Sequence, residues 1–292
     1  MPEPAKGCFK RFAPSLPTRD KVRARLSNGE SGRAIYDAVA GGDRAEVERL
    51  AKSDPRLLGT HAILSEGEAP FDGNSGDLLT FAVAGCDAGM VGLLLELGAA
   101  PDGQIPGQPL SLALLADDLT MAQMLLQAGA KPDARGPLNQ RPMTEALQFR
   151  SLEGVALLLR NGADPNGTDG FGGTPLQQAL LFGDYAGAQL LMRNGANPWQ
   201  IGSKGELPAR TLTQPVQDRA NEAIRQDLER MARKPGLPWP PPGLAETQDR
   251  FVSGQWPTME MRAAGFVASE GALQSMRMAI ANRRSAPTRS VN

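Results

Sequence analysis

The stretch NGADPNGTDGFGGTPL, residues 161–176, has the composition of a loop that could hold a phosphate group. It contains five glycines, and a helical pattern opens behind them at Pro175. Backbone N–H groups of a glycine-rich loop can cradle phosphate oxygens at the start of a helix. A P-loop also needs a lysine directly after its glycines, and none follows here. We therefore interpret this stretch as a structural turn, and we expect no cofactor.

Residues suited to catalysis or metal binding are scarce elsewhere in the chain. His61 is the only histidine, which excludes a Cys/His metal cluster and leaves any histidine-based triad with that one residue. The stretch DGNSGD, residues 72–77, resembles a calcium loop only weakly, because its glycine is out of register and no terminal glutamate follows at the required distance. The sequence predicts no catalytic residue and no metal site, so we expect that the protein is not an enzyme.

The charge of the 292-residue chain is unevenly distributed. The net charge is −1, but residues 1–33 carry +5 and residues 271–292 carry +4, which leaves −10 for the part between them. An acidic body between two basic ends does not favour nucleic-acid binding by the chain as a whole. The basic ends are either solvated tails or tails that contact an acidic partner or a membrane surface.

Nothing in the sequence predicts export or membrane insertion. The N-terminal residues lack an apolar run of signal-peptide length, and no stretch approaches the roughly 20 apolar residues of a membrane span. Cys8 and Cys86 are the only cysteines, too few for a disulfide framework. We expect a cytoplasmic protein, and the composition, rich in Ala, Arg, Gly and Pro, suggests a bacterial one.

A repeat of about 33 residues organises the middle of the chain. The pair Gly-Ala occurs at residues 98–99, 129–130, 162–163 and 195–196. Prolines that open helical patterns occur every 33 residues, at Pro109, Pro142, Pro175 and Pro208. The glycine-rich stretch is therefore one copy of a repeated module, and its glycines serve the turn that joins one repeat to the next.

These modules resemble ankyrin repeats. The segments GTPLQQAL and GADPNG, together with three Leu-Leu runs, match the family pattern closely. The family's histidine after Thr-Pro-Leu is absent, and its place holds Thr80, Ser111, Thr144 or Gln177. The resemblance implies an all-α fold, an ankyrin-repeat solenoid of stacked helix-turn-helix modules with finger loops. We add to it a Pro-rich and helical C-terminal extension.

Local signals in the module agree with paired helices. Pro175 suits the first position of a helix, and Thr174 before it can act as the N-cap. Gly195 suits the left-handed position that ends the second helix. A lone helix pair cannot bury the face that carries Leu190 and Leu191, so neighbouring pairs must stack.

The sequence predicts three regions. Residues 1–31 form a basic N-terminal segment that we expect to be poorly ordered, and residues 32–234 form the solenoid. Residues 235–292 hold a Pro-rich strap and a C-terminal helix. The repeats are expected near residues 32–58, 77–103, 107–134, 140–167 and 173–200, with a degenerate cap at 205–234.

The cap at residues 205–234 is predicted to bury a stripe of Ala220, Ile224, Leu228 and Met231. Two segments after the cap leave alternatives open. The segment PGLPWPPPGL, residues 235–244, is either a strap on its own domain or a ligand of an SH3-type domain. The helix at residues 269–284 either packs back on the solenoid or docks in a groove of a partner.

The resemblance implies that partners bind finger tips and the ends of first helices. The partner-binding residues expected on that basis are Ile105, Leu115, Leu138, Gln148, Phe149, Phe171, Leu181, Phe182 and Trp199. We expect a module that is monomeric on its own and binds another protein, as an adaptor or an immunity-type inhibitor. The alternatives are an effector delivered to a host cell, or an enzyme whose active part is the C-terminal extension.

Overall fold

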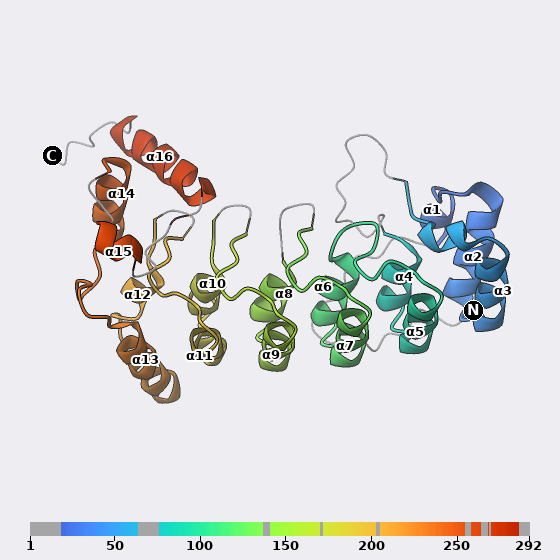
Figure 1. Ribbon diagram of the computed structural model, residues 1–292, viewed down its shortest axis with the longest axis horizontal. Helices are drawn as coiled ribbons and strands as arrows, with labels where there is room; N and C mark the ends of the chain where they lie inside the picture. The colour runs from blue at the N-terminus through green and yellow to red at the C-terminus, as the bar shows by residue number, and fades with distance from the viewer. Residues whose placement is uncertain are drawn as a thin grey trace. The chain divides into compact units, whose positions relative to one another are not determined.

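The computed structural model describes residues 19–63, 76–136, 141–169, 172–202, 205–254, 258–263, 268 and 270–285 (Figure 1). It divides into two compact units, Met1–Gly162 (unit 1) and Ala163–Asn292 (unit 2). Within the described ranges the regular elements are helices, and β-structure is limited to isolated bridges. The expected all-α fold of stacked helix pairs is confirmed.

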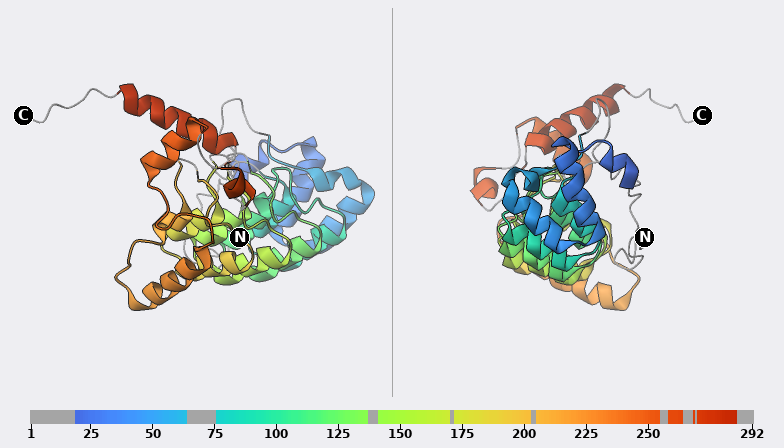
Figure 2. Two further views of the ribbon diagram at one scale, coloured as in Figure 1. Left: turned by 60° about the vertical axis from the view of Figure 1, so that its left-hand side comes forward. Right: turned by 90° about the vertical axis from the view of Figure 1, so that its right-hand side faces the viewer.

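Unit 1 contains two layers of helices (Figures 1 and 2). The first helices of the pairs pack side by side, and so do the second helices. The first helices are α2 (Gly29–Gly41), α4 (Leu78–Ala84), α6 (Gln108–Leu115) and α8 (Pro142–Gln148). The second helices are α3 (Arg44–Ser53), α5 (Ala88–Glu96), α7 (Leu119–Gln127) and α9 (Leu152–Arg160), and a 3-10 turn, η1 (Pro55–Gly59), follows α3.

Unit 2 contains two more helix pairs and the C-terminal helices. The pairs are α10 (Pro175–Leu181) with α11 (Tyr185–Arg193), and α12 (Pro208–Thr211) with α13 (Arg219–Ala232). Helices α14 (Leu244–Val252), α15 (Met259–Ala263) and α16 (Glu270–Ser285) follow. Helix α10 packs on α12, α11 packs on α13, and α16 packs on α14.

The described part of the N-terminal segment, from Arg19 onward, is more ordered than its composition suggests. Helix α1 (Arg19–Arg23) and the start of α2 both lie within residues 1–31, which we expected to be poorly ordered. Val22 and Leu26 are buried, and the backbone of Leu26 forms an antiparallel bridge with Ala62. These two apolar side chains explain the difference, because burying them stabilises a segment that is otherwise strongly charged. Residues 1–18 lie outside the described part of the chain.

The turn inside five of the helix pairs, α2–α3, α4–α5, α6–α7, α8–α9 and α10–α11, repeats one backbone device. The residue at the bend adopts a left-handed conformation, with φ between 54° and 73°, at Gly42, Cys86, Asp117, Arg150 and Gly183. The next residue caps the second helix by accepting a hydrogen bond from the backbone N–H three residues on, over 2.9–3.2 Å. These caps are Asp43, Asp87, Asp118, Ser151 and Asp184. The device fixes the angle at which each chain reverses.

Helix α10 and its partner confirm the local signals read from the sequence. Pro175 opens α10, and the Thr174 hydroxyl accepts a hydrogen bond from the backbone N–H of Gln177 at 3.1 Å. Gly195 follows α11 with a φ of 93°. Leu191 is fully buried, whereas Leu190 is only half-buried. Proline, cap and glycine therefore specify where this helix pair begins and ends.

The expected apolar stripe on α13 is partly wrong. Leu228 is buried as predicted, but Ala220 and Met231 are exposed, and Arg225 and Ala232 are buried instead. The buried guanidinium pairs with two carboxylates of its own helix, at 2.7 Å from Glu222 and 2.8 Å from Glu229, and it also donates to the carbonyl of Leu212. These bonds satisfy the charge of Arg225 and so allow the helix to turn that residue inward.

The Pro-rich segment lies on its own unit, held by side-chain contacts. The Trp239 ring packs edge-on against Trp199, with ring centroids 6.4 Å apart, and the Arg233 guanidinium lies 4.8 Å from the Trp239 centroid. The Arg210 guanidinium donates to the backbone carbonyl of Pro241 at 3.0 Å. A segment of this kind has no hydrogen bonds of its own, so such contacts are what hold it in place.

The C-terminal helix buries much of its predicted stripe. Met276 and Ile280 of α16 are buried, and Leu273 is half-buried. Ala272, one residue earlier, is fully buried. In both views of Figure 2 α16 lies beside α14, the helix on which it packs. Within unit 2 the helix thus packs back on its own chain.

Replacing Arg150 with Gly should leave unit 1 more stable than replacing it with Ala, because both changes remove the same side-chain contacts and only Ala keeps a Cβ at a φ of 54°. A residue with a Cβ in the left-handed conformation costs about 1 kcal/mol relative to glycine, so we expect the free energy of unfolding of the two variants to differ by about that amount. Urea unfolding followed by circular dichroism measures it, with the slope unchanged. The control is Gly129→Ala, at a φ of 99° with open space around the added Cβ, which should lower stability relative to the wild type. Equal stabilities of Arg150→Gly and Arg150→Ala would contradict the prediction.

Replacing Arg225 with Met should destabilise unit 2 in a pH-dependent way. The hydrogen bond from Arg225 is the largest cause that lowers the pKa of Glu222, to about 2, and hydrogen bonds from Arg233 and then Arg225 lower the pKa of Glu229. A carboxyl with a lowered folded-state pKa stabilises the fold above its unfolded-state pKa and loses that effect as pH falls. The drop in melting temperature caused by Arg225→Met should therefore be largest at pH 7 and shrink below about pH 4.5.

A matched control uses the exposed pair on the same helix. Arg230→Met removes the partner of Asp227, a pair whose arginine is 73% exposed. Its effect on the melting temperature should be smaller, because exposed ion pairs contribute little. Equal drops for the two variants at every pH would show that the buried guanidinium adds nothing specific.

Candidate protein-binding surface

Each first helix of unit 1 buries one side and leaves the other partly open. In α6 the side chains of Leu110 and Leu114 are fully buried, and in α8 Met143 and Leu147 are buried. Side chains three and four residues apart share a face of a helix, so the open side collects a separate set of residues. We call this set the inner face of unit 1: Phe81 and Ala84 of α4, Leu112 and Leu115 of α6, and Glu145, Gln148 and Phe149 of α8 and its cap.

The inner face of unit 1 is mostly apolar and only half covered. Leu112, Leu115 and Phe149 are half-buried, and Gln148 is exposed. At one end of the face, the Phe81 ring packs edge-on against Tyr36, with centroids 5.2 Å apart. The structure therefore places the predicted residues Leu115, Gln148 and Phe149 on one continuous side of adjoining helices.

Glu145 is the one acidic residue of this face. Its side chain is half-buried, and burial raises the pKa of its carboxyl above the usual value. In the part of the chain that the structure describes, its carboxylate takes part in no hydrogen bond and no ion pair. Glu145 was not predicted from the sequence. Its place one period after Leu112 was the available signal, because the repeat puts a charged residue where the preceding repeat has a leucine.

The finger between α5 and α6 is tied to its neighbours through backbone bonds. The Asp102 carboxylate accepts from the backbone N–H of Lys131 at 2.7 Å, and the Asp77 carboxylate accepts from the backbone N–H of Gln104. Ile105 at this finger is half-buried. The other two predicted finger residues, Leu138 and Phe171, lie outside the described residues.

Unit 2 presents a shorter version of the same surface. Leu181, the last residue of α10, is 79% exposed, and Phe182 after it is half-buried. A leucine that is so exposed at the end of a short helix contributes nothing to the core of unit 2. It is available for contact with another molecule.

Trp199 was expected at the partner-binding surface, and the structure corrects this. Its side chain is fully buried, and its indole N–H donates to the backbone carbonyl of Ala232 at 2.8 Å. The ring also packs against Trp239 of the Pro-rich segment. Trp199 is thus a core residue of unit 2, because the C-terminal part of the chain covers the surface that the repeat alone would leave open.

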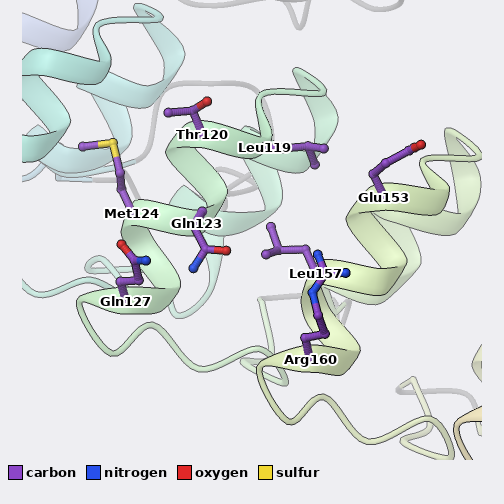
Figure 3. A pocket seen from close by; sticks show the side chains of 8 residues that line it. All are labelled: Leu119, Thr120, Gln123, Met124, Gln127, Glu153, Leu157 and Arg160. Carbon is purple, nitrogen blue, oxygen red and sulfur yellow. The ribbon is translucent and has the colours of Figure 1, made fainter.

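A groove lies in the layer of second helices of unit 1, where the sequence predicted none. It is an open groove of about 540 Å³ between the second helices α7 and α9 (Figure 3). Apolar and polar side chains alternate along it, and Glu153 and Arg160 border it on α9. Its lining residues are Leu119, Thr120, Gln123, Met124, Gln127, Glu153, Leu157 and Arg160. Such a lining shows no convergence of polar groups on one point.

Neither a metal-binding cluster nor a membrane-spanning helix is found among the described residues. No group of three or more His, Cys, Asp or Glu side chains among them is placed to hold a metal ion. Among the same residues, no helix has the length and apolar character to cross a bilayer.

Comparison with known proteins agrees with the geometry. A family model described as ankyrin repeats in three copies matches residues 110–201. This part of the chain consists of ankyrin repeats. The crystal structure of the ankyrin repeat domain of Bcl-3, described as a unique member of the IkappaB protein family, aligns with a TM-score of 0.55 and 24% sequence identity. That alignment covers 69% of this chain and 86% of the Bcl-3 chain, and at this identity it shows the fold alone. No curated protein matched the sequence.

Replacing Glu145 with Gln should raise the melting temperature at pH 7. A carboxyl with a raised folded-state pKa stabilises the fold below its unfolded-state pKa and loses that contribution as pH rises through the folded-state value. The advantage of Gln should therefore be greatest at neutral pH and smaller at pH 4. Thermal unfolding followed by circular dichroism measures both. The control is Glu153→Gln, an exposed glutamate on α9, which should change neither value. A lower melting temperature of Glu145→Gln at pH 7 would mean that the carboxylate is paired in the folded protein.

Proposed function

We propose that this ankyrin repeat protein is a non-catalytic module that binds another protein through its inner faces and finger loops, as an adaptor or an immunity-type inhibitor. Ankyrin repeats are a protein-interaction module, which supports the general assignment. The observation that carries the proposal is the solvent exposure of apolar residues at the ends of first helices. In unit 2 Leu181 is 79% exposed and Phe182 is half-exposed; in unit 1 Leu115, at the place of Leu181, and Phe149, at the place of Phe182, are half-exposed.

When no partner is bound, those exposed apolar residues add nothing to the stability of the fold. The core residues of the first helices lie on the opposite side of each helix, where Leu114, Leu147 and Ala179 are fully buried. Apolar side chains left in water add no stability, and each one that a partner covers contributes about 1 kcal/mol or more. Exposed apolar residues gathered on one side of a unit are typical of a protein-binding site.

The C-terminal extension supports the non-catalytic assignment only through its structural role. The Pro-rich segment and α16 are both occupied by packing within unit 2, through Trp239 and Met276. The competing proposal, an enzyme whose active part is this extension, requires a cluster of reactive side chains there. An effector delivered to a host cell would use the same binding surface, so the adaptor, inhibitor and effector roles differ in the partner and not in the surface.

Replacing Leu181 with Asp should weaken partner binding at least tenfold without unfolding the protein. The partner is first captured by crosslinking in cells of the source organism and then purified, and its dissociation constant is measured by calorimetry. Phe149→Ala should cost about 2 kcal/mol of binding free energy if the ring is a hot spot. If binding also abolishes the partner's activity, the protein is an inhibitor; if the complex recruits a third protein, it is an adaptor.

The control is Leu244→Asp at the start of α14, another exposed leucine of unit 2. It introduces the same charge away from the first-helix ends and should leave the dissociation constant unchanged. Equal loss for both variants, or none for either, would refute the assignment of the binding surface.

A further inference from the structure

We propose that the inner face of unit 1 selects a partner segment carrying apolar side chains and one Lys or Arg, whose cation pairs with the Glu145 carboxylate. This inference rests on the proposed function and adds to it the charge chemistry of the partner. It makes Glu145 a specificity-determining residue of the surface.

The first step is the position of Glu145 among apolar neighbours. Glu145 lies one repeat period after Leu112, which itself lies one period after Phe81, so the three residues occupy the same place on the first helices α8, α6 and α4. Those helices pack in this order, α4 on α6 and α6 on α8. One carboxylate therefore stands at the end of a row whose other members are a leucine and a phenylalanine.

The second step is that the fold itself leaves this carboxylate unpaired. Two other half-buried acids of unit 1 do have partners: Asp87 binds the Arg44 guanidinium at 2.7 Å, and Asp133 binds the Arg141 guanidinium at 2.9 Å. Arg141 lies one helical turn before Glu145, yet its ion pair is made with Asp133. Among the described residues, the Glu145 carboxylate has no such partner, and burial already raises its pKa.

The third step is the consequence of covering the face. Gln148 and Phe149 lie three and four residues after Glu145, on the same side of α8, so a segment that covers Leu115 and Phe149 must also cover the carboxylate. Burying a charge without a partner is unfavourable, whereas a cation placed against the charge offsets that penalty. A segment that is apolar throughout is therefore rejected, and one with an acid at this place is repelled.

The net charge of the chain between its two basic ends also favours a basic partner segment. The part between the two basic ends has a net charge of −10, which attracts a basic segment and slows the approach of an acidic one. A partner segment with one cation among apolar residues thus fits both the local and the long-range charge. The favoured occupant is a protein segment, because the apolar residues of the face need an apolar ligand and not a free cation.

The test uses a displayed library of random 16-residue peptides, selected separately on the full-length protein and on its variants. Peptides selected on the wild-type chain should be enriched in apolar residues and contain a Lys or Arg at a fixed place. Peptides selected on Glu145→Gln should lose that basic residue. The matched control Glu153→Gln, which removes a charge from the outer face of α9, should select the same peptides as the wild type.

Affinities of one selected peptide then test the pairing directly. Glu145→Gln should weaken binding about tenfold, and replacing the basic residue of the peptide with Gln should do the same. The two changes together should cost no more than either alone, because they remove one interaction. A Glu145→Lys variant should recover binding to a peptide whose basic residue is replaced with Glu. Circular dichroism of each variant confirms that it is folded.

The outcomes separate this inference from the proposed function. If selected peptides lose affinity with Leu115→Ala and Phe149→Ala but carry no basic residue, and bind Glu145→Gln equally well, the inner face binds protein and the charge inference is wrong. If no peptide is selected, or if the selected peptides are insensitive to Leu115→Ala and Phe149→Ala, the inner face is not the binding surface and both proposals fail.

Discussion

The rest of this structure depends on one constraint: a single pair of short helices cannot bury all of its apolar surface. Each helix packs against the other helix of its pair, but its remaining apolar side is covered only when the pair stacks on another pair. Helices such as α4 and α8 have seven residues, too few to be stable in isolation. Stacking on adjoining pairs is what stabilises them, and the stack stays regular only if every pair is bent at the same angle. The left-handed residue at the bend and the capping side chain after it provide that constant angle.

The same constraint explains why a binding surface is left over. Stacking covers the sides of a first helix that face its own second helix and its neighbours, as the complete burial of Leu110 and Leu114 shows. Stacking cannot cover the remaining side of a first helix, which faces away from the second helices. Side chains there are free of packing requirements, so they can be apolar, as at Leu115, or charged, as at Glu145, according to what they contact outside the fold.

The ends of a stack need a different solution, because a terminal pair lacks a neighbour on one side. Helix α13 meets this need with a charged exterior and an arginine folded inward between two glutamates. The Pro-rich segment adds a second cover, in which Trp239 packs on Trp199. In unit 1, Val22 and Leu26 bring part of a strongly basic segment into the fold.

Much of this was accessible from the sequence, because a 33-residue period in Pro, Gly and Leu positions reflects local rules that each repeat obeys by itself. The positions of Pro175 and Gly195 and the cap at Thr174 follow from backbone requirements, so the helix boundaries of that repeat could be predicted. The row of Leu115, Gln148 and Phe149 follows from the same period. What the period could not supply was the burial of any individual side chain.

Burial was decided by contacts between residues far apart in the chain. Trp199 was predicted at the partner-binding surface, but α13 and the Pro-rich segment enclose it, and neither obeys the repeat. The inward face of α13 was misjudged because a helical pattern of apolar residues ignores an arginine that two glutamates neutralise. Glu145 was overlooked for the opposite reason: only the packed structure shows that its carboxylate is half-buried and has no cation beside it. The sequence by itself determined the repeat, its turns and its caps, since these depend on neighbours within a few residues, whereas tertiary packing alone decided which side chains remain for a partner.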